Sequence, residues 1–151
     1  MDDAHRKATQ DLYALNADYW HDVDMNWGRN IAQFFTEDGV FEGGAATYRG
    51  IAKIQEFYQW RVDRGARVAV HAFTNFRVKL LSATQAECTW YLHLYAADGE
   101  PVLLSEPPIS IAYVVDTCTK DDAGTWRYTY RKFKPLFHGK KPPTNPKLDE
   151  K

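Results

Sequence analysis

Residues 86–96 read Ala-Glu-Cys-Thr-Trp-Tyr-Leu-His-Leu-Tyr-Ala, and this run decides the fold class. Its side chains alternate between two sets, which is the period of two that a β-strand gives. One set is Cys88, Trp90, Leu92 and Leu94, and the other is Thr89, Tyr91, His93 and Tyr95. The run therefore predicts a long strand with one apolar face, ended by a turn at Asp98-Gly99.

The chain on either side of this run divides into helices before it and strands around it. Everything after Gly65 predicts strand, in the segments 67–73, 76–81, 109–117 and 126–133, with turns at 82–84 and 120–124. A short strand is also predicted over 40–42, after a turn at 36–39.

Three helices are predicted in the first 65 residues. The first has its apolar stripe at Ala8, Leu12, Leu15 and Tyr19 and is expected to end near Asp22 or Val23. The second carries Trp27, Ile31, Phe34 and Phe35, and the third runs from Ile51 to a stop at Gly65. Three N-terminal helices on a strongly curved antiparallel sheet make an α+β domain, a cone that encloses a cavity.

Length and composition limit the class of protein. The 151 residues predict one domain over 1–138 and a polar, proline-containing tail over 139–151. A formal net charge of −1 argues against nucleic acid as a partner, and no apolar run is long enough to span a membrane. Cys88 and Cys118 have no CxxC spacing, so a zinc ribbon, a redox pair and a disulfide framework are not expected. A cytoplasmic protein is the expectation.

Aromatic residues make up 15% of the chain, which is the unusual feature of its composition. So many large rings in a small fold favour an aromatic-lined cavity for a hydrophobic small molecule. The expected lining consists of Tyr19, Trp20, Trp27, Phe41, Tyr48, Tyr58, Trp90 and Phe133.

Catalytic chemistry would have to come from side chains acting as acids and bases. No nucleotide-binding motif is present and the five histidines do not cluster, so neither a cofactor nor a metal is expected. His71 is a candidate base in an otherwise apolar strand, and the alternative is a core histidine bonded to a backbone carbonyl. Asp24 is a candidate partner, and its alternative is to cap the second helix. Tyr19 lies five residues before Asp24, so the two converge only if the helix ends between them.

Several short motifs, in this order and spacing, resemble a known family. They are Gln10-Asp11-Leu12-Tyr13, Asp24-x-x-Trp27, Phe34-Phe35-x-x-Asp38-Gly39-Val40-Phe41, Tyr48-Arg49-Gly50-Ile51, His71-x-x-Thr74-Asn75, and Trp126 at the start of the last strand. Over residues 8–137 the chain is similar to SnoaL-like members of the NTF2-like superfamily, which have the cone-shaped α+β fold.

The functional resemblance is to cofactor-free lyases: scytalone dehydratase, bile-acid 7α-dehydratase, hexachlorocyclohexane dehydrochlorinase and diarylpropane γ-formaldehyde lyase. It implies a catalytic pair of Asp24 and His71, with Tyr19 at the tyrosine position of the bile-acid enzyme. The Lys134-Pro135 step resembles one in scytalone dehydratase. The position of that enzyme's second tyrosine falls on Phe41 or Glu42, and the position of its second histidine falls near Ala96, with His93 only nearby. Inward-pointing Arg131 or Lys134 would add positive charge, although surface positions are favoured for both.

Dehydration of an aromatic or polycyclic molecule is the preferred hypothesis. A C–C lyase that releases formaldehyde from a lignin-derived diol needs the same base, and an isomerase is a third possibility. The competitors without catalysis are a small-molecule-binding module and a subunit like the small subunit of ring-hydroxylating oxygenases. A homo-oligomer is expected, because the second face of an open sheet is partly apolar. The resemblance to the dehydratases favours a trimer over a dimer.

Overall fold

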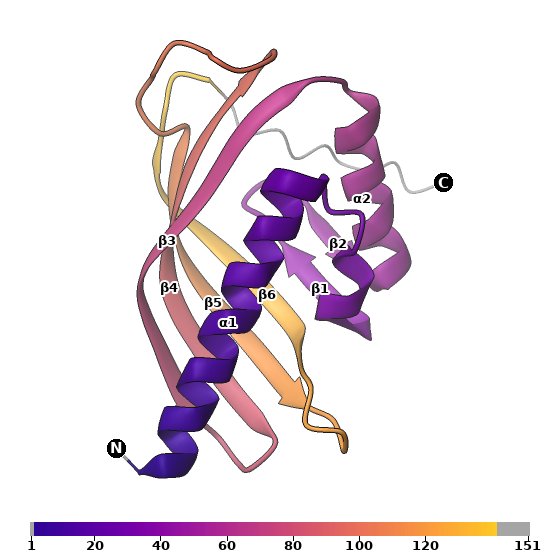
Figure 1. Cartoon of the computed structure of the whole chain (residues 1–151), viewed down its shortest axis with the longest axis vertical. Coiled ribbons are helices and arrows are strands. Elements are labelled where there is room, and N and C mark those ends of the chain that lie inside the picture. Colours follow the sequence, from indigo (N-terminus) through magenta and orange to yellow (C-terminus); the bar gives the residue numbers. More distant parts are fainter. Residues whose placement is uncertain (1, 142–151) are drawn as a thin grey trace.

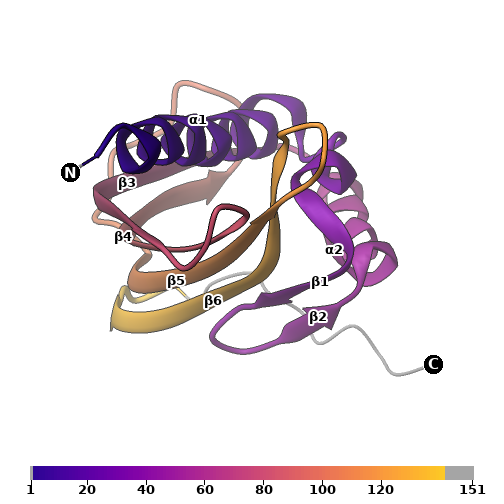
Figure 2. The same ribbon diagram turned by 90° about the horizontal axis from the view of Figure 1, so that it is seen from below.

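The computed structural model describes residues 2–141, which form one curved sheet and the helices packed against it (Figures 1 and 2). The elements are α1 (Asp3–Asn26), a 3-10 turn η1 (Ile31–Phe34), β1 (Phe35–Glu42), β2 (Thr47–Arg49), α2 (Ile51–Asp63), β3 (Arg67–Leu80), β4 (Gln85–Asp98), β5 (Ser110–Lys120) and β6 (Trp126–His138). The strand order is β2-β1-β6-β5-β4-β3. Figure 2 shows α1 lying across the hollow of the sheet, and α2 packs on β1 and β2. The α+β class and the curved sheet are therefore confirmed.

Helix α1 is longer than predicted. Asp2 caps its start, with a carboxylate oxygen that accepts from the His5 backbone N–H at 2.8 Å. The helix continues beyond Val23 to Asn26, because no residue in between breaks the hydrogen-bond ladder. It ends where Trp27 takes a left-handed conformation with φ 60° and its N–H bonds to the Asp22 carbonyl. The predicted end near Asp22 or Val23 is wrong, so Tyr19 and Asp24 lie on one continuous helix.

The expectation of three helices is also wrong, because the described residues contain two α-helices. Only one 3-10 turn forms over Ile31–Phe34, and Phe35 already begins β1. The predicted turn at 36–39 lies within β1, where the pairing with β6 shifts register between Phe35 and Val40. Adjacent Phe34 and Phe35 are both buried, and burial alone does not distinguish a helical turn from the start of a strand.

The sheet is antiparallel except at one pair. β1 lies parallel to β6, with Phe41 opposite Arg131, which the all-antiparallel expectation did not include. β3 and β4 pair along their whole length, with His71 opposite Leu94, and the register shifts between Thr74 and Arg77. Asn75 adopts a left-handed φ of 57° at that shift, a conformation that asparagine tolerates well. The resulting bend in β3 contributes to the curvature of the sheet.

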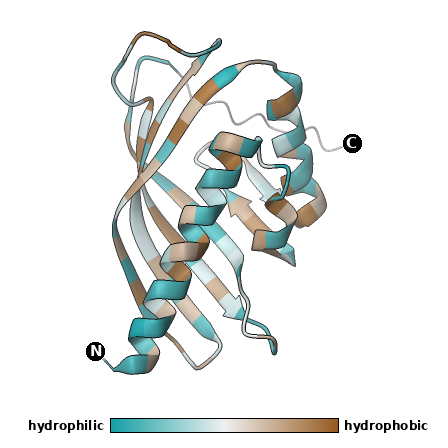
Figure 3. Ribbon diagram, viewed as in Figure 1, coloured by the Kyte–Doolittle hydropathy of each residue, from teal (hydrophilic) through white to brown (hydrophobic). Residues whose placement is uncertain are grey.

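The core lies between α1, α2 and the concave face of the sheet. On β4 the alternation behaves as predicted, with Ala86, Cys88, Trp90 and Leu92 buried on the inner face. Figure 3 shows hydrophilic and hydrophobic residues alternating along α1, as expected for a helix with one face against the core. In the described range, no helix has the length and apolar character needed to cross a membrane. The predicted tail over 139–151 lies outside the described residues from 142 onward.

Candidate active site

Asp24 and His71 are bonded to each other. Asp24 Oδ1 lies 2.6 Å from His71 Nδ1, and Asp24 Oδ2 accepts from the His71 backbone N–H at 2.9 Å. The His71 side chain is 8% exposed and that of Asp24 is 15% exposed, so the pair is largely shielded from water. Both carboxylate oxygens are thus committed to one residue of β3, and Asp24 does not cap a second helix.

Local helix geometry places this carboxylate over the strand. Trp20 and Asp24 are four residues apart on α1, so they share the face that packs against β3. The Trp20 ring stacks on the His71 ring with centroids 4.4 Å apart and an interplanar angle of 6°. One turn of α1 therefore fixes both the plane of the imidazole and the hydrogen bond at Nδ1.

The geometry determines the protonation pattern of His71. Asp24 accepts at Nδ1, so Nδ1 carries the proton and Nε2 keeps its lone pair. Nε2 has no hydrogen-bond partner within residues 2–141. Burial lowers the pKa of His71 below its usual value, the bond to Asp24 opposes this, and the charges of Arg61 and Arg67 add to the lowering. A neutral imidazole with a free lone pair is a competent proton acceptor near neutral pH.

His71 forms part of the wall of a cavity of about 330 Å³. That volume is at the small end of the range for ligand sites. Most of the wall is apolar and includes Trp20, Phe41, Phe57, Leu92, Leu94 and Phe133. The polar side chains in the wall are Tyr58, Arg61, Arg67, His71, Ser110 and His138. The arrangement is a hydrophobic chamber with one acid–base pair and a few hydrogen-bonding groups.

Tyr19 lies behind the cavity wall. Its side chain is 0% exposed and its hydroxyl bonds to the Tyr58 hydroxyl at 2.7 Å. Because α1 does not end between Tyr19 and Asp24, the two side chains leave the helix in different directions. Tyr58, from α2, is the tyrosine that reaches the cavity. Burial raises the pKa of Tyr58 to about 12 although Arg61 opposes it, so Tyr58 is a protonated donor at neutral pH.

The other aromatic residues predicted to line the cavity divide into two groups. Four of them line the cavity, namely Trp20, Phe41, Tyr58 and Phe133. Tyr48 is buried and stacks on Phe57, with ring centroids 4.6 Å apart. Trp90 is buried in the core, and its Nε1 donates to Asp116 Oδ2 at 2.7 Å. Trp27 is half-buried at the end of α1. Part of the aromatic excess therefore builds the core.

The expectation that Arg131 lies at the surface is wrong. Its side chain is 0% exposed, and its Nε donates to Asp116 Oδ1 at 2.8 Å. The guanidinium carbon lies 3.8 Å from the Tyr128 ring centroid and 4.4 Å from that of Tyr19. Burial disfavours its charge, yet Asp116 raises the pKa of Arg131, so the pair stays ionised. Lys134 is exposed and lines a shallow groove beside β1 and β2, not the cavity.

Sequence reasoning missed four polar residues of the cavity wall, which are Arg61, Arg67, Ser110 and His138. For the two arginines a signal was available, because Arg61 lies three residues after Tyr58 on a helix and Arg67 four residues before His71 on a strand. Both spacings put the arginine on the same face as the neighbour. Among residues 2–141, no three His, Cys, Asp or Glu side chains are grouped closely enough to hold a metal ion.

Comparison with known families identifies the chain. Residues 5–132 match the profile of the SnoaL-like domain. The chain belongs to the SnoaL-like family. The family resemblance inferred from the sequence motifs is thereby confirmed, and the match runs from the first turn of α1 to the middle of β6.

Solved structures share this SnoaL-like fold over most of the chain. One is a protein of Novosphingobium aromaticivorans provisionally described as a scytalone dehydratase, with a TM-score of 0.80 and 18% identity over 100% of this chain and 99% of that one. LinA has a TM-score of 0.74 and 19% identity, with 100% of both chains covered. A Nostoc punctiforme protein of unknown function, described as having a cystatin-like fold, has a TM-score of 0.69 and 20% identity over 84% of this chain and 90% of that one. The comparison with curated proteins found no match.

Proposed function

We propose that this SnoaL-like protein is a cofactor-independent lyase that eliminates water from a hydrophobic aromatic or polycyclic molecule. The observation that carries the proposal is the Asp24–His71 pair in the wall of an apolar cavity of about 330 Å³. A description as a scytalone dehydratase for one protein of the same fold is consistent with this class of reaction.

In the proposed reaction, His71 Nε2 removes a proton from a carbon atom of the substrate. The electron pair of the broken C–H bond forms a C=C bond, and the C–O bond to the neighbouring carbon breaks. Asp24 stabilises the imidazolium formed, because its carboxylate accepts a hydrogen bond from Nδ1–H, with 2.6 Å between Oδ1 and Nδ1. The departing hydroxide takes up the proton from His71 and leaves as water, so the protein returns to its starting state.

Tyr58 is the proposed donor to the leaving oxygen. Its hydroxyl is protonated at neutral pH and its side chain lines the cavity together with His71. Tyr19 is a positioning residue in this proposal, since it reaches the substrate only through the bond between the two hydroxyls. The low dielectric of the apolar wall strengthens both the attraction between Asp24 and the His71 imidazolium and the hydrogen bond from Tyr58 to the leaving oxygen.

The test is a screen of aromatic diols and hydroxysteroids, read by mass spectrometry, with His71→Ala as the loss variant. General-base action is worth about 10²–10⁴-fold, so the folded variant should lose most turnover. His93→Ala is the matched control, because His93 lies on β4 outside the cavity and bonds to Thr74. Loss of water supports elimination, whereas loss of formaldehyde would replace it with C–C cleavage by the same base. Turnover by folded His71→Ala within about threefold of wild type would end the proposal.

We also propose a homo-oligomer, with the trimer favoured by the resemblance. The support is apolar exposure: Val102 is 99% exposed and Leu104 is 93% exposed in the segment between β4 and β5. Tyr95 and Phe137 are also exposed on strands at the outer side of the sheet. Light scattering at micromolar concentration tests this, and a stable monomer would remove it.

A further inference from the structure

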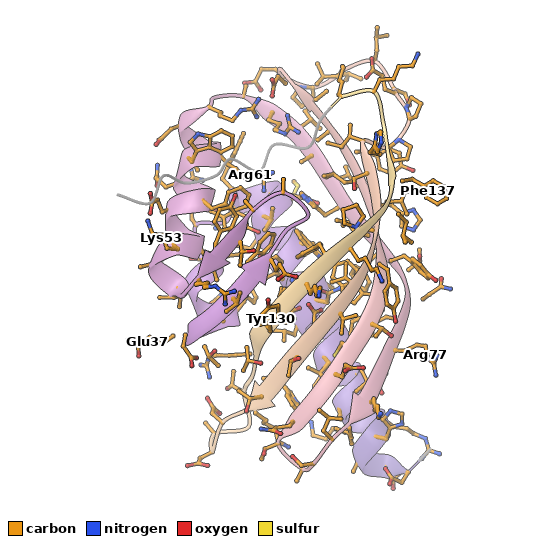
Figure 4. The ribbon with its side chains drawn as sticks, turned by 180° about the vertical axis from the view of Figure 1, so that it is seen from behind. Glu37, Lys53, Arg61, Arg77, Tyr130 and Phe137 are labelled. Atoms are coloured by element: carbon orange, nitrogen blue, oxygen red, sulfur yellow. The ribbon has the colours of Figure 1, made fainter. Side chains whose placement is uncertain are left out.

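Two arginines flank the part of the cavity where α2 meets β3. Arg61 lies in the last turn of α2, Arg67 is the first residue of β3, and both line the same cavity as His71. Figure 4 shows Arg61 on the side of α2 that faces the sheet, while Phe137 points away from the sheet on its outer side. The short connection between the two elements brings both guanidinium groups to one end of the cavity.

Neither arginine has its hydrogen-bonding capacity filled. The Arg67 side chain is 10% exposed, and its NH1 donates to Asp98 Oδ1 at 3.0 Å. Its Nε is buried and has no partner in the described part of the chain. Arg61 forms no ion pair with any residue from 2 to 141, and its guanidinium carbon lies 5.7 Å from the Tyr58 ring centroid. Buried donors without acceptors cost free energy, and a guanidinium offers paired donors that match a carboxylate.

Trp20 adds a third unpaired donor to the cavity wall. Its Nε1 is buried and has no acceptor within residues 2–141, although the ring stacks on His71. No carboxylate in the wall is left to accept from these N–H groups, since Asp24 is already committed to His71 and Asp98 lies outside the cavity. A ligand that completes these interactions must bring acceptor oxygens.

We infer that Arg61 and Arg67 form a carboxylate-binding subsite, so that the substrate of the cavity is a hydrophobic carboxylic acid. The assignment to a substrate rests on the proposed lyase function, whereas the binding subsite does not. Arg67 and His71 share one face of β3 and are four residues apart, which is about 13 Å along a strand. The carboxylate is thus remote from the carbon that loses its proton, and a ring system fills the apolar space between them.

Binding at this subsite also changes the base. The charged and titratable groups that face His71 are Asp24 of α1, Tyr58 and Arg61 of α2, and Arg67 of β3, with His138 of β6 in the same wall. Arg61 and Arg67 lower the pKa of His71 beyond the effect of burial. A bound carboxylate offsets their charge, so it raises the pKa of His71 and makes Nε2 a stronger base when substrate is present.

The experiment uses calorimetric titration of the whole chain with biphenylcarboxylate and with its neutral carboxamide. We expect the acid to bind more tightly, and Arg67→Gln to weaken its binding about 10- to 100-fold without affecting the amide, as for charge-assisted hydrogen bonds. Arg61→Gln should act in the same direction. Arg64→Gln is the matched control, because Arg64 pairs with the same Asp98 carboxylate but does not line the cavity. NMR titration of His71 should show a higher pKa with the acid bound and no change with the amide.

Three results overturn the subsite. They are equal affinity for acid and amide, a loss in Arg64→Gln as large as in Arg67→Gln, and no binding of the acid at millimolar concentration. Failure of the lyase proposal is distinguishable, because it leaves arginine-dependent binding of the acid intact while no hydroxylated relative is turned over. Conversely, if neutral alcohols are turned over and the rate depends on His71 but not on Arg67, the lyase proposal stands and the carboxylate-subsite proposal fails.

Discussion

Replacing Asp24 by asparagine tests the paired arrangement without any need for a substrate. Asp24 accepts two hydrogen bonds from His71, one at Nδ1 and one at the backbone N–H. Asparagine has one carbonyl oxygen, so it can accept only one of them, and its amide group then faces the other donor. If the oxygen keeps the backbone bond, Nδ1 must become an acceptor and the ring proton moves to Nε2. The lone pair that faces the cavity is then lost.

The expected magnitude follows from the same contacts. One hydrogen bond to a charged acceptor is lost at a site where His71 is 8% exposed and Asp24 is 15% exposed. Exchanging a hydrogen bond to a charged acceptor for one between neutral groups costs about 1 kcal/mol in the free energy of unfolding. Turnover should fall by about 10²–10⁴-fold, because Nε2 no longer accepts a proton. The fold should survive, since the substitution removes no apolar volume.

The assay combines urea unfolding with long-range nitrogen–proton NMR of the histidine rings. The wild type should show the proton on Nδ1 of His71, and the variant should show it on Nε2. Asp18→Asn is the matched control, as Asp18 is exposed on the same helix and makes no hydrogen bond with the other described residues. An unchanged His71 tautomer together with a change in stability of less than about 0.5 kcal/mol, the range of surface substitutions, would refute the pairing.

Three further predictions follow from the surroundings of the site. Since the pKa of His71 is lowered in the folded state, the unfolded chain binds more protons just below pH about 6.5, and stability should fall as pH drops from there toward the folded pKa. Urea unfolding at several pH values should show this fall in the free energy of unfolding for the wild type and not for His71→Gln. The same pH dependence in both proteins would argue against a buried neutral imidazole. Tyr58→Phe should slow turnover about 10²-fold, and Tyr19→Phe should slow it less because Tyr19 acts through Tyr58; equal losses would contradict this order. Asp116→Asn leaves the fully buried Arg131 without its counter-charge and should destabilise the fold by about 3–5 kcal/mol in chemical denaturation. A loss below about 1 kcal/mol would mean that water reaches Arg131.

Periodicity in the sequence was enough to predict β3 to β6 and the apolar stripes of the two helices, but it missed β2 (Thr47–Arg49) and gave only residues 40–42 of β1. The alternation over 86–96 became β4, with Cys88, Trp90 and Leu92 on its buried face, and the stripe through Leu12 and Tyr19 became the buried face of α1. Periodicity could not decide where α1 ends, because Asp22 to Asn26 contain no residue that forbids a helix. It also could not separate a helical turn from a strand around Phe34 and Phe35, since both are buried in either case.

The candidate site was predicted only in part, because sequence patterns relate neighbouring residues and not residues far apart in the chain. The residues indicated His71 and Asp24 as candidates, but their catalytic pairing came from the family resemblance, since no local pattern relates residues 47 positions apart in the chain. The burial of Arg131 depends on Asp116, its partner on the neighbouring strand β5, and on the rings of Tyr19 and Trp20 from α1 and of Trp90 from β4. A single charged residue in a strand pattern does not reveal such a partner.

The sequence by itself determined the class of fold, the family and the chemistry available, because these depend on residue types and on spacings along the chain. Only the tertiary structure decided which tyrosine reaches the cavity, which arginine is buried, and that Arg61 and Arg67 line the same cavity as His71. Those outcomes depend on the register between β3 and β4, on the length of α1 and on the packing of α2 against β1 and β2. Helix and strand periods are local properties of the backbone, whereas a site is made where segments distant in sequence pack together.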